Sequence, residues 1–175
     1  EAFNSIYEAY KKYDNQTIFY SDLIVKYKSA EITLKADNKI ESLSSGNSQI
    51  SHPTMFVPRN IYLKHGFFDL NFDTYGADRE LILRFKKQRI KFIKLENKLS
   101  TFNFGGATSN YDLGNIAKQI AQEFKLLIKY FTFIKALKTT IKLTYRLLRN
   151  LLLSKALPQK IFLRLRLKKL GFIEH

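Results

Sequence analysis

The last third of the chain, from about Asp112 onward, carries the pattern that most restricts what this sequence can fold into. Leu, Ile, Phe and Tyr recur there between basic residues that lie mostly three, four or six positions apart: Lys125, Lys129, Lys135, Lys138, Lys142, Arg146 and Arg149. Apolar and charged residues with this spacing are typical of an amphipathic α-helix. Pro158 interrupts the pattern, and a basic stripe restarts with Lys160, Arg164 and Lys168. We therefore expect residues 111–175 to form an all-helical basic tail.

The positive charge of the chain is concentrated in this tail. The whole chain has 30 basic and 15 acidic residues, a net charge of +15. Residues 124–175 hold 13 of the basic residues and one acid, Glu174, whereas residues 1–123 have a net charge of only +3. Such an asymmetry indicates two segments with different roles. We predict a body at residues 1–110 and a tail at residues 111–175.

The composition excludes several kinds of site. The chain has no cysteine, which excludes disulfides and thiolate chemistry. Its three histidines, His52, His65 and His175, lie at no metal-ligand spacing, and nothing resembles HExxH or an EF-hand. No serine lies in a GxSxG elbow, and no glycine-rich phosphate loop is present. We therefore predict no metal ligands and no nucleophilic triad in these residues.

The sequence also bears on location. No stretch approaches the roughly 18–20 uninterrupted apolar residues that span a bilayer. The N-terminal EAFNSIYEAYKKY is amphipathic and carries acids, unlike a signal peptide. We expect a cytoplasmic protein, peripheral on the inner face of the cell membrane if the tail binds lipid. The start at Glu1 rather than Met is consistent with a piece of a longer protein.

The body has the alternating pattern of an α/β fold. Apolar periodicity predicts helices over residues 2–13, 59–64 and 78–88. β-Branched and aromatic runs predict strands over residues 17–20, 23–27, 31–35, 55–57, 91–95 and 99–104. The polar stretch ADNKIESLSSGNSQIS, residues 36–51, is expected to be a surface loop, and Gly66 a left-handed helix cap.

One carboxylate in this body has two interpretations. Asp78 follows Gly76-Ala77 at the start of a helical run in YGADRELILRF, residues 75–85. A carboxylate in a first helical turn interacts favourably with the helix dipole and can cap free amides. A carboxylate fixed there and facing a cleft could equally act as a general base. The spacing alone favours the structural role without excluding the chemical one.

Four motifs around Asp78 occur in a characteristic order. They are SH…F from Ser51, R…Y…GFFD over residues 59–69, AD-x-EL-x-LR over residues 77–84, and FNFGGATS at residues 102–109. In this order they resemble the C-terminal half of the catalytic domain of family-2 glycosyltransferases. IFYSD, residues 18–22, resembles the segment of that family that usually reads YGD. The resemblance covers roughly residues 1–110.

The resemblance implies an inverting enzyme of the GT-A fold that uses a nucleotide-sugar donor. The acid of the family's AD pair deprotonates the acceptor hydroxyl, and it matches Asp78. His52, expected on the strand that leads into the site, matches a position near the sugar or acceptor, although it could instead cap a strand end. Ala77 and Arg79, on either side of Asp78, are expected to contact substrate. The acceptor would be a glycan or a lipid-linked sugar in polysaccharide or glycolipid synthesis.

The other charged residues of these motifs are expected to be structural. Asp69 should hold the turn before Asp78, and Glu80 points too far round the helix to share the direction of Asp78. Arg59 and Arg84 are expected to be solvated or paired, with phosphate contact as the alternative.

The departure from the family concerns the donor. In the family, a paired-Asp motif binds Mg²⁺ or Mn²⁺ and the diphosphate, and no such motif occurs here. The resemblance therefore implies a partial GT-A-like mixed sheet with flanking helices, whose nucleotide-binding half and metal ligands precede residue 1. Such a fragment is expected to be inactive alone.

The tail leaves several alternatives open. A basic helix with interleaved apolar residues suits an anionic membrane surface, but its apolar side could also pack on the body and leave Lys and Arg in solvent. Nucleic-acid binding is not favoured, because no recognised nucleic-acid motif accompanies the high pI. The alternative to an enzyme is thus a non-catalytic module that binds membrane or nucleic acid through the tail.

Overall fold

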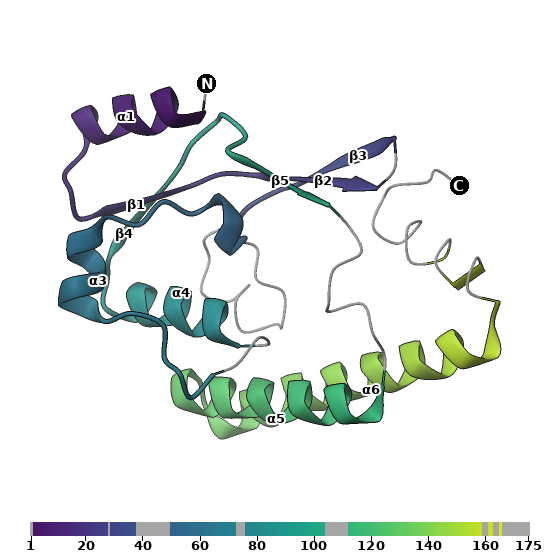
Figure 1. Cartoon of the computed structure of the whole chain (residues 1–175). Coiled ribbons are helices and arrows are strands. Elements are labelled where there is room, and N and C mark those ends of the chain that lie inside the picture. Colours follow the sequence, from purple (N-terminus) through teal and green to yellow (C-terminus); the bar gives the residue numbers. More distant parts are fainter. Residues whose placement is uncertain are drawn as a thin grey trace. The chain divides into compact units, whose positions relative to one another are not determined.

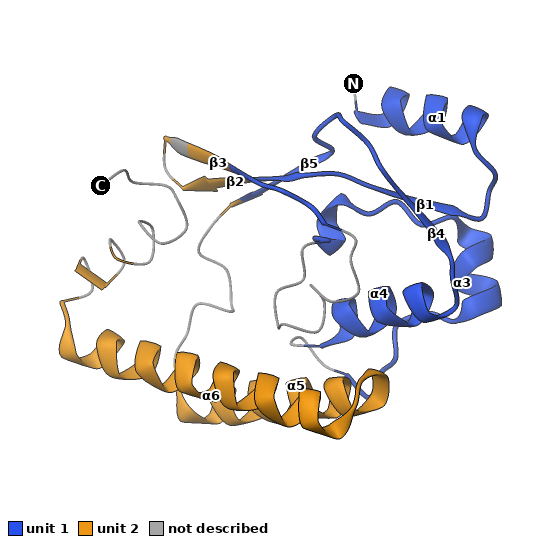
Figure 2. Cartoon of the chain, turned by 180° about the vertical axis from the view of Figure 1, so that it is seen from behind, with its two compact units in different colours: residues 1–24, 33–102 blue, residues 25–32, 103–175 orange. Residues whose placement is uncertain are grey.

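The computed structural model describes residues 2–27, 29–37, 50–72, 76–103, 112–158, 161–162 and 165. The chain divides into two compact units (Figure 2). Unit 1 comprises Glu1–Ile24 and Thr33–Phe102, and unit 2 comprises Val25–Ile32 and Asn103–His175. Unit 1 thus holds most of the predicted body, and unit 2 holds the predicted tail together with residues 25–32 and 103–110 of the body.

Helices and strands alternate through the body, and two long helices follow (Figure 1). In chain order the elements are α1 (Ala2–Lys12), β1 (Thr17–Tyr20), β2 (Leu23–Tyr27), β3 (Ala30–Leu34), the 3₁₀ helix η1 (His52–Thr54), α3 (Arg59–His65), α4 (Ala77–Lys87), β4 (Lys91–Lys94), β5 (Ser100–Asn103), α5 (Leu113–Tyr130) and α6 (Phe133–Ala156). The predicted α/β class with a helical C-terminal part is therefore confirmed.

The centre of unit 1 is the parallel pair β1–β4, in which Ile18 lies opposite Phe92 and Tyr20 opposite Lys94. All four residues of β1 are buried, which is typical of parallel strands covered on both faces. Figure 1 shows α1 on one side of this pair and α3 and α4 on the other. The predicted strand at residues 55–57 is reduced to a single antiparallel bridge between Phe19 and Phe56.

Helix α4 supplies much of the core of unit 1. Its residues Leu81, Ile82, Leu83 and Phe85 are completely buried. Tyr62 of α3 meets the edge of the Phe85 ring, with ring centroids 6.0 Å apart. Side chains buried around most of its circumference make α4 a rigid support for residues at its N-terminus.

A second sheet has the strand order β3–β2–β5. The division between the two units passes through all three of its strands, since Leu23, Thr33 and Phe102 belong to unit 1 while Val25, Ile32 and Asn103 belong to unit 2. The predicted loop at residues 36–51 falls mainly outside the described residues, as does Phe104 at the end of the last predicted strand.

Unit 2 contains a hairpin of two helices. α5 begins at the cap residue Asp112, whose side chain accepts a hydrogen bond from the amide of Asn115 (2.9 Å). The helix ends at Tyr130, and α6 starts after the extended cap residue Thr132. α5 and α6 lie side by side in both views (Figures 1 and 2), and Ile116 packs with three residues of α6: Leu143, Leu147 and Leu151.

Two expectations for this region need refinement. The basic stripe predicted as one continuous feature is divided by the turn at Phe131–Thr132, which leaves Lys125 and Lys129 on α5 and the later cations on α6. The helix ends before Pro158, as expected, but Lys160, Arg164 and Lys168 lie outside the described residues. Within the described part of the chain, each helix is too short or too polar to cross a lipid bilayer.

Candidate active site

Asp78 occupies the first turn of α4, two residues after the cap residue Gly76. A Cβ atom on Gly76 would lie 3.1 Å from Cδ1 of Phe72, so the chain enters the helix through a space that suits glycine. The side chain of Asp78 is 60% exposed. The predicted helix-start position is therefore confirmed, and the carboxylate remains open to a ligand.

His52 lies next to this carboxylate. Its Nδ1 atom is 4.0 Å from Oδ1 of Asp78, and its side chain is 34% exposed. This distance is too long for a hydrogen bond, but it allows an ion pair when the imidazole is protonated. The structure thus brings together the two residues that the family resemblance selected.

The prediction that His52 lies on a strand is wrong. His52 begins η1, in which Pro53 fixes its own φ and the hydroxyl of Thr54 donates to the carbonyl oxygen of Ser51 (2.8 Å). The 3₁₀ turn formed by these residues prevents His52 from pairing with a neighbouring strand.

Aromatic side chains lie near the pair. The ring of Phe68 meets the edge of the His52 ring at a centroid distance of 5.3 Å. Tyr62 stacks on Phe67 at 5.5 Å, and burial, followed by the negative charge of Asp78, raises the pKa of the Tyr62 phenol. Tyr62 was not among the predicted site residues, although it is the tyrosine of the R…Y…GFFD motif.

A buried ion pair within α4 positions an arginine that binds the end of α3. Glu80 is completely buried, and its carboxylate lies 3.2 Å from Nη2 of Arg84. The Arg84 guanidinium also donates to the carbonyl oxygens of His65 and Phe67. Removing one partner of such a pair would leave an uncompensated buried charge. Glu80 and Arg84 are therefore structural, as expected, and they fix the segment that precedes Asp78.

Gly66 is required at the point where Arg84 crosses this segment. Its φ of 90° and ψ of 153° lie in a region essentially restricted to glycine. A Cβ atom there would also lie 2.6 Å from Nη1 of Arg84. Gly66 has the predicted positive φ, but its ψ is extended, so the prediction of a left-handed helical cap is wrong in this respect.

The remaining predicted residues have clear positions. Asp69 accepts hydrogen bonds from the backbone amide (3.0 Å) and the side-chain amide (2.9 Å) of Asn71, which confirms its role in the turn. Ala77 and Arg79 are half-buried in the first turn of α4, and Arg59 is exposed. Substrate contact by Ala77 and Arg79 stays a prediction.

A second charged cluster lies at Asp22, the acid of IFYSD. Its Oδ1 atom is 2.6 Å from Nζ of Lys94 and its Oδ2 atom is 2.9 Å from Nζ of Lys35. The amide of Ala36 also donates to Oδ1 (2.8 Å). Burial by itself raises the pKa of Asp22, but the hydrogen bonds from Lys94, Ala36 and Lys35 outweigh it and lower the pKa to about 2. This carboxylate is committed to holding three segments of unit 1 together.

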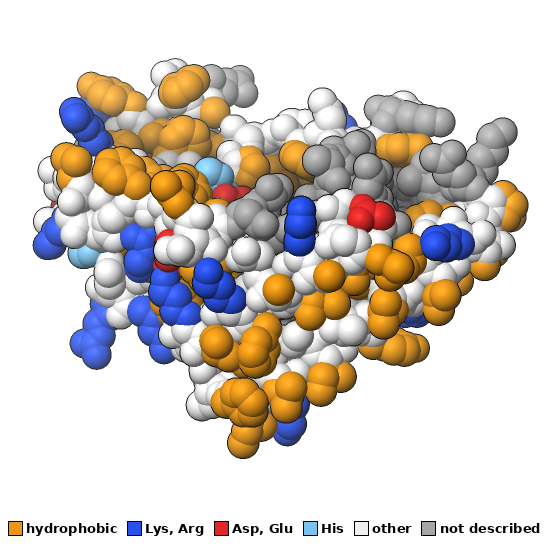
Figure 3. Space-filling model, turned by 60° about the horizontal axis from the view of Figure 1, so that its bottom comes forward, with side chains coloured by type: hydrophobic (Ala, Val, Ile, Leu, Met, Phe, Trp, Pro, Cys, Tyr) orange, Lys and Arg blue, Asp and Glu red, His pale blue; other side chains and the backbone are white. Residues whose placement is uncertain are grey.

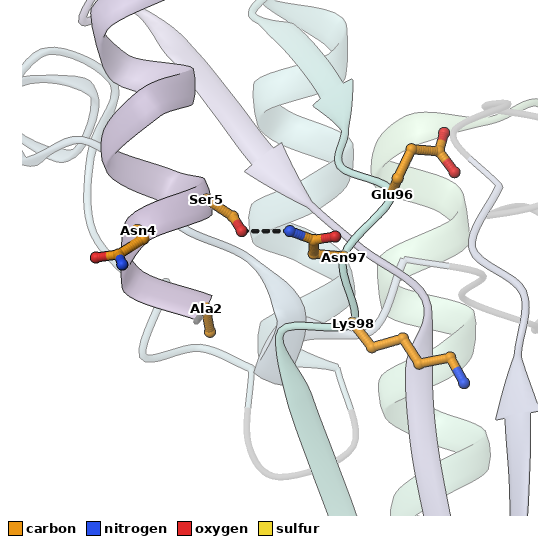
Figure 4. A pocket seen from close by; sticks show the side chains of 6 residues that line it. All are labelled: Ala2, Asn4, Ser5, Glu96, Asn97 and Lys98. Atoms are coloured by element: carbon orange, nitrogen blue, oxygen red, sulfur yellow. Dashed lines mark hydrogen bonds between the residues drawn. The ribbon is translucent and has the colours of Figure 1, made fainter.

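A surface hollow of about 690 Å³ lies between the start of α1 and the segment after β4. It is lined by Ala2, Asn4, Ser5, Glu96, Asn97 and Lys98. Figure 4 shows the Asn97 amide pointing to the Ser5 hydroxyl, to which it donates a hydrogen bond. None of the site residues discussed above lines this hollow, so we assign it no part in the chemistry of Asp78.

The divalent metal implied by the resemblance has no fitting ligand set among the described residues. No group of three His, Cys, Asp or Glu side chains there could hold a metal ion. Asp22 is committed to its two lysines, and Asp78 has His52 beside it. We therefore assign none of these residues a metal-binding role.

Comparison with known proteins does not identify the chain. No family model matches it, and neither a search of curated proteins nor a search of solved structures found a match.

Proposed function

We propose that this chain carries the acceptor-activating part of an inverting glycosyltransferase. The observation that supports it is the accessible carboxylate of Asp78, at the start of a rigid buried helix and 4.0 Å from His52. General-base catalysis needs such a group, held in place but reachable by substrate. The ordered motifs around Asp78 supply the reaction type.

The chemistry requires one proton transfer and one displacement. Asp78 takes the proton of an acceptor hydroxyl as the oxygen attacks the anomeric carbon of a nucleotide sugar. The bond from that carbon to the diphosphate oxygen breaks, and the nucleoside diphosphate leaves with the bonding electrons. Attack opposite the leaving group inverts the anomeric configuration. Donor binding is assigned to a part of the enzyme other than residues 1–110.

The neighbours of Asp78 would orient the acceptor. His52 offers a ring nitrogen at the carboxylate, which could hold the same hydroxyl. Phe68, 37% exposed, offers an apolar surface beside His52 on which the C–H face of a sugar ring could rest. These roles are compatible with the exposure of the three side chains and do not require movement of α4.

The direct test is Asp78→Asn in the longest natural chain that contains residues 1–175. The amide cannot accept the proton, so we expect transfer to fall on the order of 10²–10⁴-fold while donor binding is retained. Assays of radiolabelled sugar transfer from a panel of nucleotide sugars measure the loss of transfer. Calorimetry with the preferred donor measures donor binding. Asp112→Asn is the matched control, because Asn is also a good helix cap.

Two outcomes would contradict the assignment. Near wild-type turnover of the Asp78→Asn variant would exclude Asp78 as the base. A product with the anomeric configuration of the donor, established by NMR, would exclude direct displacement by an acceptor that Asp78 activates.

A further inference from the structure

Helix α6 has three different sides. The first side is buried in the structure and consists of Ala136, Thr140, Leu143, Leu147 and Leu151. The three leucines of this side pack with Ile116 and Ile120 of α5. The hydrophobic core of the hairpin is therefore formed by one side of α6, and the remaining apolar residues of the helix are not needed for it.

The second side is an exposed apolar stripe. Its members are separated by three or four positions and are each 42–69% exposed: Ile134, Leu137, Ile141, Tyr145, Leu148 and Leu152. At a rise of about 1.5 Å per residue the stripe is about 27 Å long. Figure 3 brings forward the lower side of the view in Figure 1, where α5 and α6 lie, and shows many exposed hydrophobic side chains there. We call these six residues the α6 stripe.

The third side is basic. A cation directly follows five of the six stripe residues: Lys135, Lys138, Lys142, Arg146 and Arg149. Because one residue corresponds to a rotation of about 100° on a helix, these cations form a row along one flank of the stripe. Lys155 is outside this row, since it follows Leu152 by three positions and therefore lies on the side of the stripe, near the end of the helix. The whole of α6 contains no acidic residue.

We infer that the α6 stripe and its basic flank form a docking surface for an anionic lipid bilayer. Helices of this kind lie in the membrane interface with their apolar side among the acyl chains and their cations at the headgroups. The charge argues against a second copy of the same surface, since two rows of cations would face each other. The apolar stripe argues against nucleic acid, which would require the cations alone. The inference is independent of the sugar-transfer proposal.

The chain offers a sensitive probe for this surface because it contains no Trp. Tyr145→Trp places a single indole on the stripe at a position that is 69% exposed. With phosphatidylcholine vesicles that contain phosphatidylserine we expect a blue shift of its emission and protection from aqueous quenchers. Tyr7→Trp in α1, where Tyr7 is 61% exposed, should show neither change.

Two sets of variants separate the contributions in a vesicle co-sedimentation assay. Ile141→Gln with Leu148→Gln should weaken binding about tenfold or more, while Leu63→Gln with Leu70→Gln, at exposed sites in unit 1, should not. Replacing Lys138, Lys142 and Arg149 together by glutamine should weaken binding on the order of 100-fold. The same change at Lys118, Lys125 and Lys129 of α5 is the matched control. Far-UV circular dichroism of each variant establishes that the helices remain.

Several results would overturn the inference. A Tyr145→Trp emission that is already blue-shifted and insensitive to vesicles would mean that the chain covers the stripe itself. A dimer in sedimentation that Ile141→Gln with Leu148→Gln dissociates would identify a second copy as the occupant. Equal vesicle binding by the triple glutamine variants of α6 and of α5 would also reject a membrane surface. Binding to DNA but not to anionic vesicles would reject it as well.

Discussion

Two carboxylates of the body show how the surroundings of a residue decide its role. Asp22 is buried and held by Lys94, Lys35 and the amide of Ala36, so its charge is used to join segments of the fold. Asp78 is 60% exposed at a helix N-terminus, so its charge is available to a ligand. Both are aspartates in the motifs of one resemblance, and only their contacts distinguish a buried acid that joins segments from an acid that remains open to a ligand.

Asp22 should make the stability of the protein depend on pH. Its pKa in the folded protein is about 2, below the value of 3.8 for an unperturbed Asp. The stabilisation is therefore fully present above about pH 4 and is lost as the pH falls toward about 2, which corresponds to roughly 2 kcal/mol in the free energy of unfolding. Urea unfolding across this range measures the loss.

The variant Asp22→Asn should be less stable at neutral pH and should lose this part of the acid dependence. Glu8→Gln removes an exposed ion pair with Lys11 and should change stability by less than about 1 kcal/mol. An Asp22→Asn protein with the stability and pH profile of the wild type would show that the cluster contributes nothing.

At the scale of the element, α6 does two things at once. One side completes the hydrophobic core of the hairpin, while the stripe and the cations beside it remain exposed. A helix that only packed on α5 would carry polar residues over the rest of its surface. The sequence left open whether the tail binds a membrane or packs on the body. In the structure one side of α6 packs on α5, within the tail itself, and the stripe on another side remains exposed.

The start of α5 gives a prediction at this scale. Asp112 caps the helix through the amide of Asn115, and replacing a capping aspartate by alanine costs about 1 kcal/mol. We expect Asp112→Ala to lower the free energy of unfolding by about this amount and to increase amide hydrogen exchange in the first turn of α5. Asp112→Ser should restore most of the loss. Unchanged exchange in the alanine variant would contradict a capping role.

At the scale of the whole molecule, the net charge of +15 must be accommodated in one folded chain. Like charges repel across a compact structure, and salt screens this repulsion over about 10 Å at 0.1 M ionic strength. The excess comes from the C-terminal part, whose residues 124–175 have a net charge of +12. Its lysines and arginines are therefore expected to destabilise the folded state when salt is low.

We accordingly expect the melting temperature to rise by roughly several degrees between very low salt and about 0.15 M NaCl. Differential scanning calorimetry measures this rise. Replacing Lys118, Lys125 and Lys129 by glutamine should reduce it, since fewer charges then repel one another. A melting temperature that falls with salt would mean that favourable ion pairs, such as those of Asp22, outweigh the repulsion.

The sequence by itself determined most of the elements of the body. The helix expected at residues 2–13 is α1, and the strands expected at residues 17–20 and 23–27 match β1 and β2. These elements follow from local periodicity, and the start of α4 beside Asp78 follows from a glycine before an apolar helical run. Patterns of this kind act over a few residues, so they can be recognised without knowledge of the fold.

Only the tertiary structure decided how distant residues meet. Segments far apart in the chain are joined by the pairing of β1 with β4 and by the approach of His52 to Asp78. The bonds of Arg84 to the carbonyl oxygens of His65 and Phe67, and the two lysines at Asp22, do the same. The turn at Phe131–Thr132 likewise folds the basic tail onto itself and selects which apolar side of α6 is buried. A sequence pattern shows that a side chain is apolar or charged, but its partner depends on packing among all the elements, and that packing sets both the candidate base and the exposed stripe.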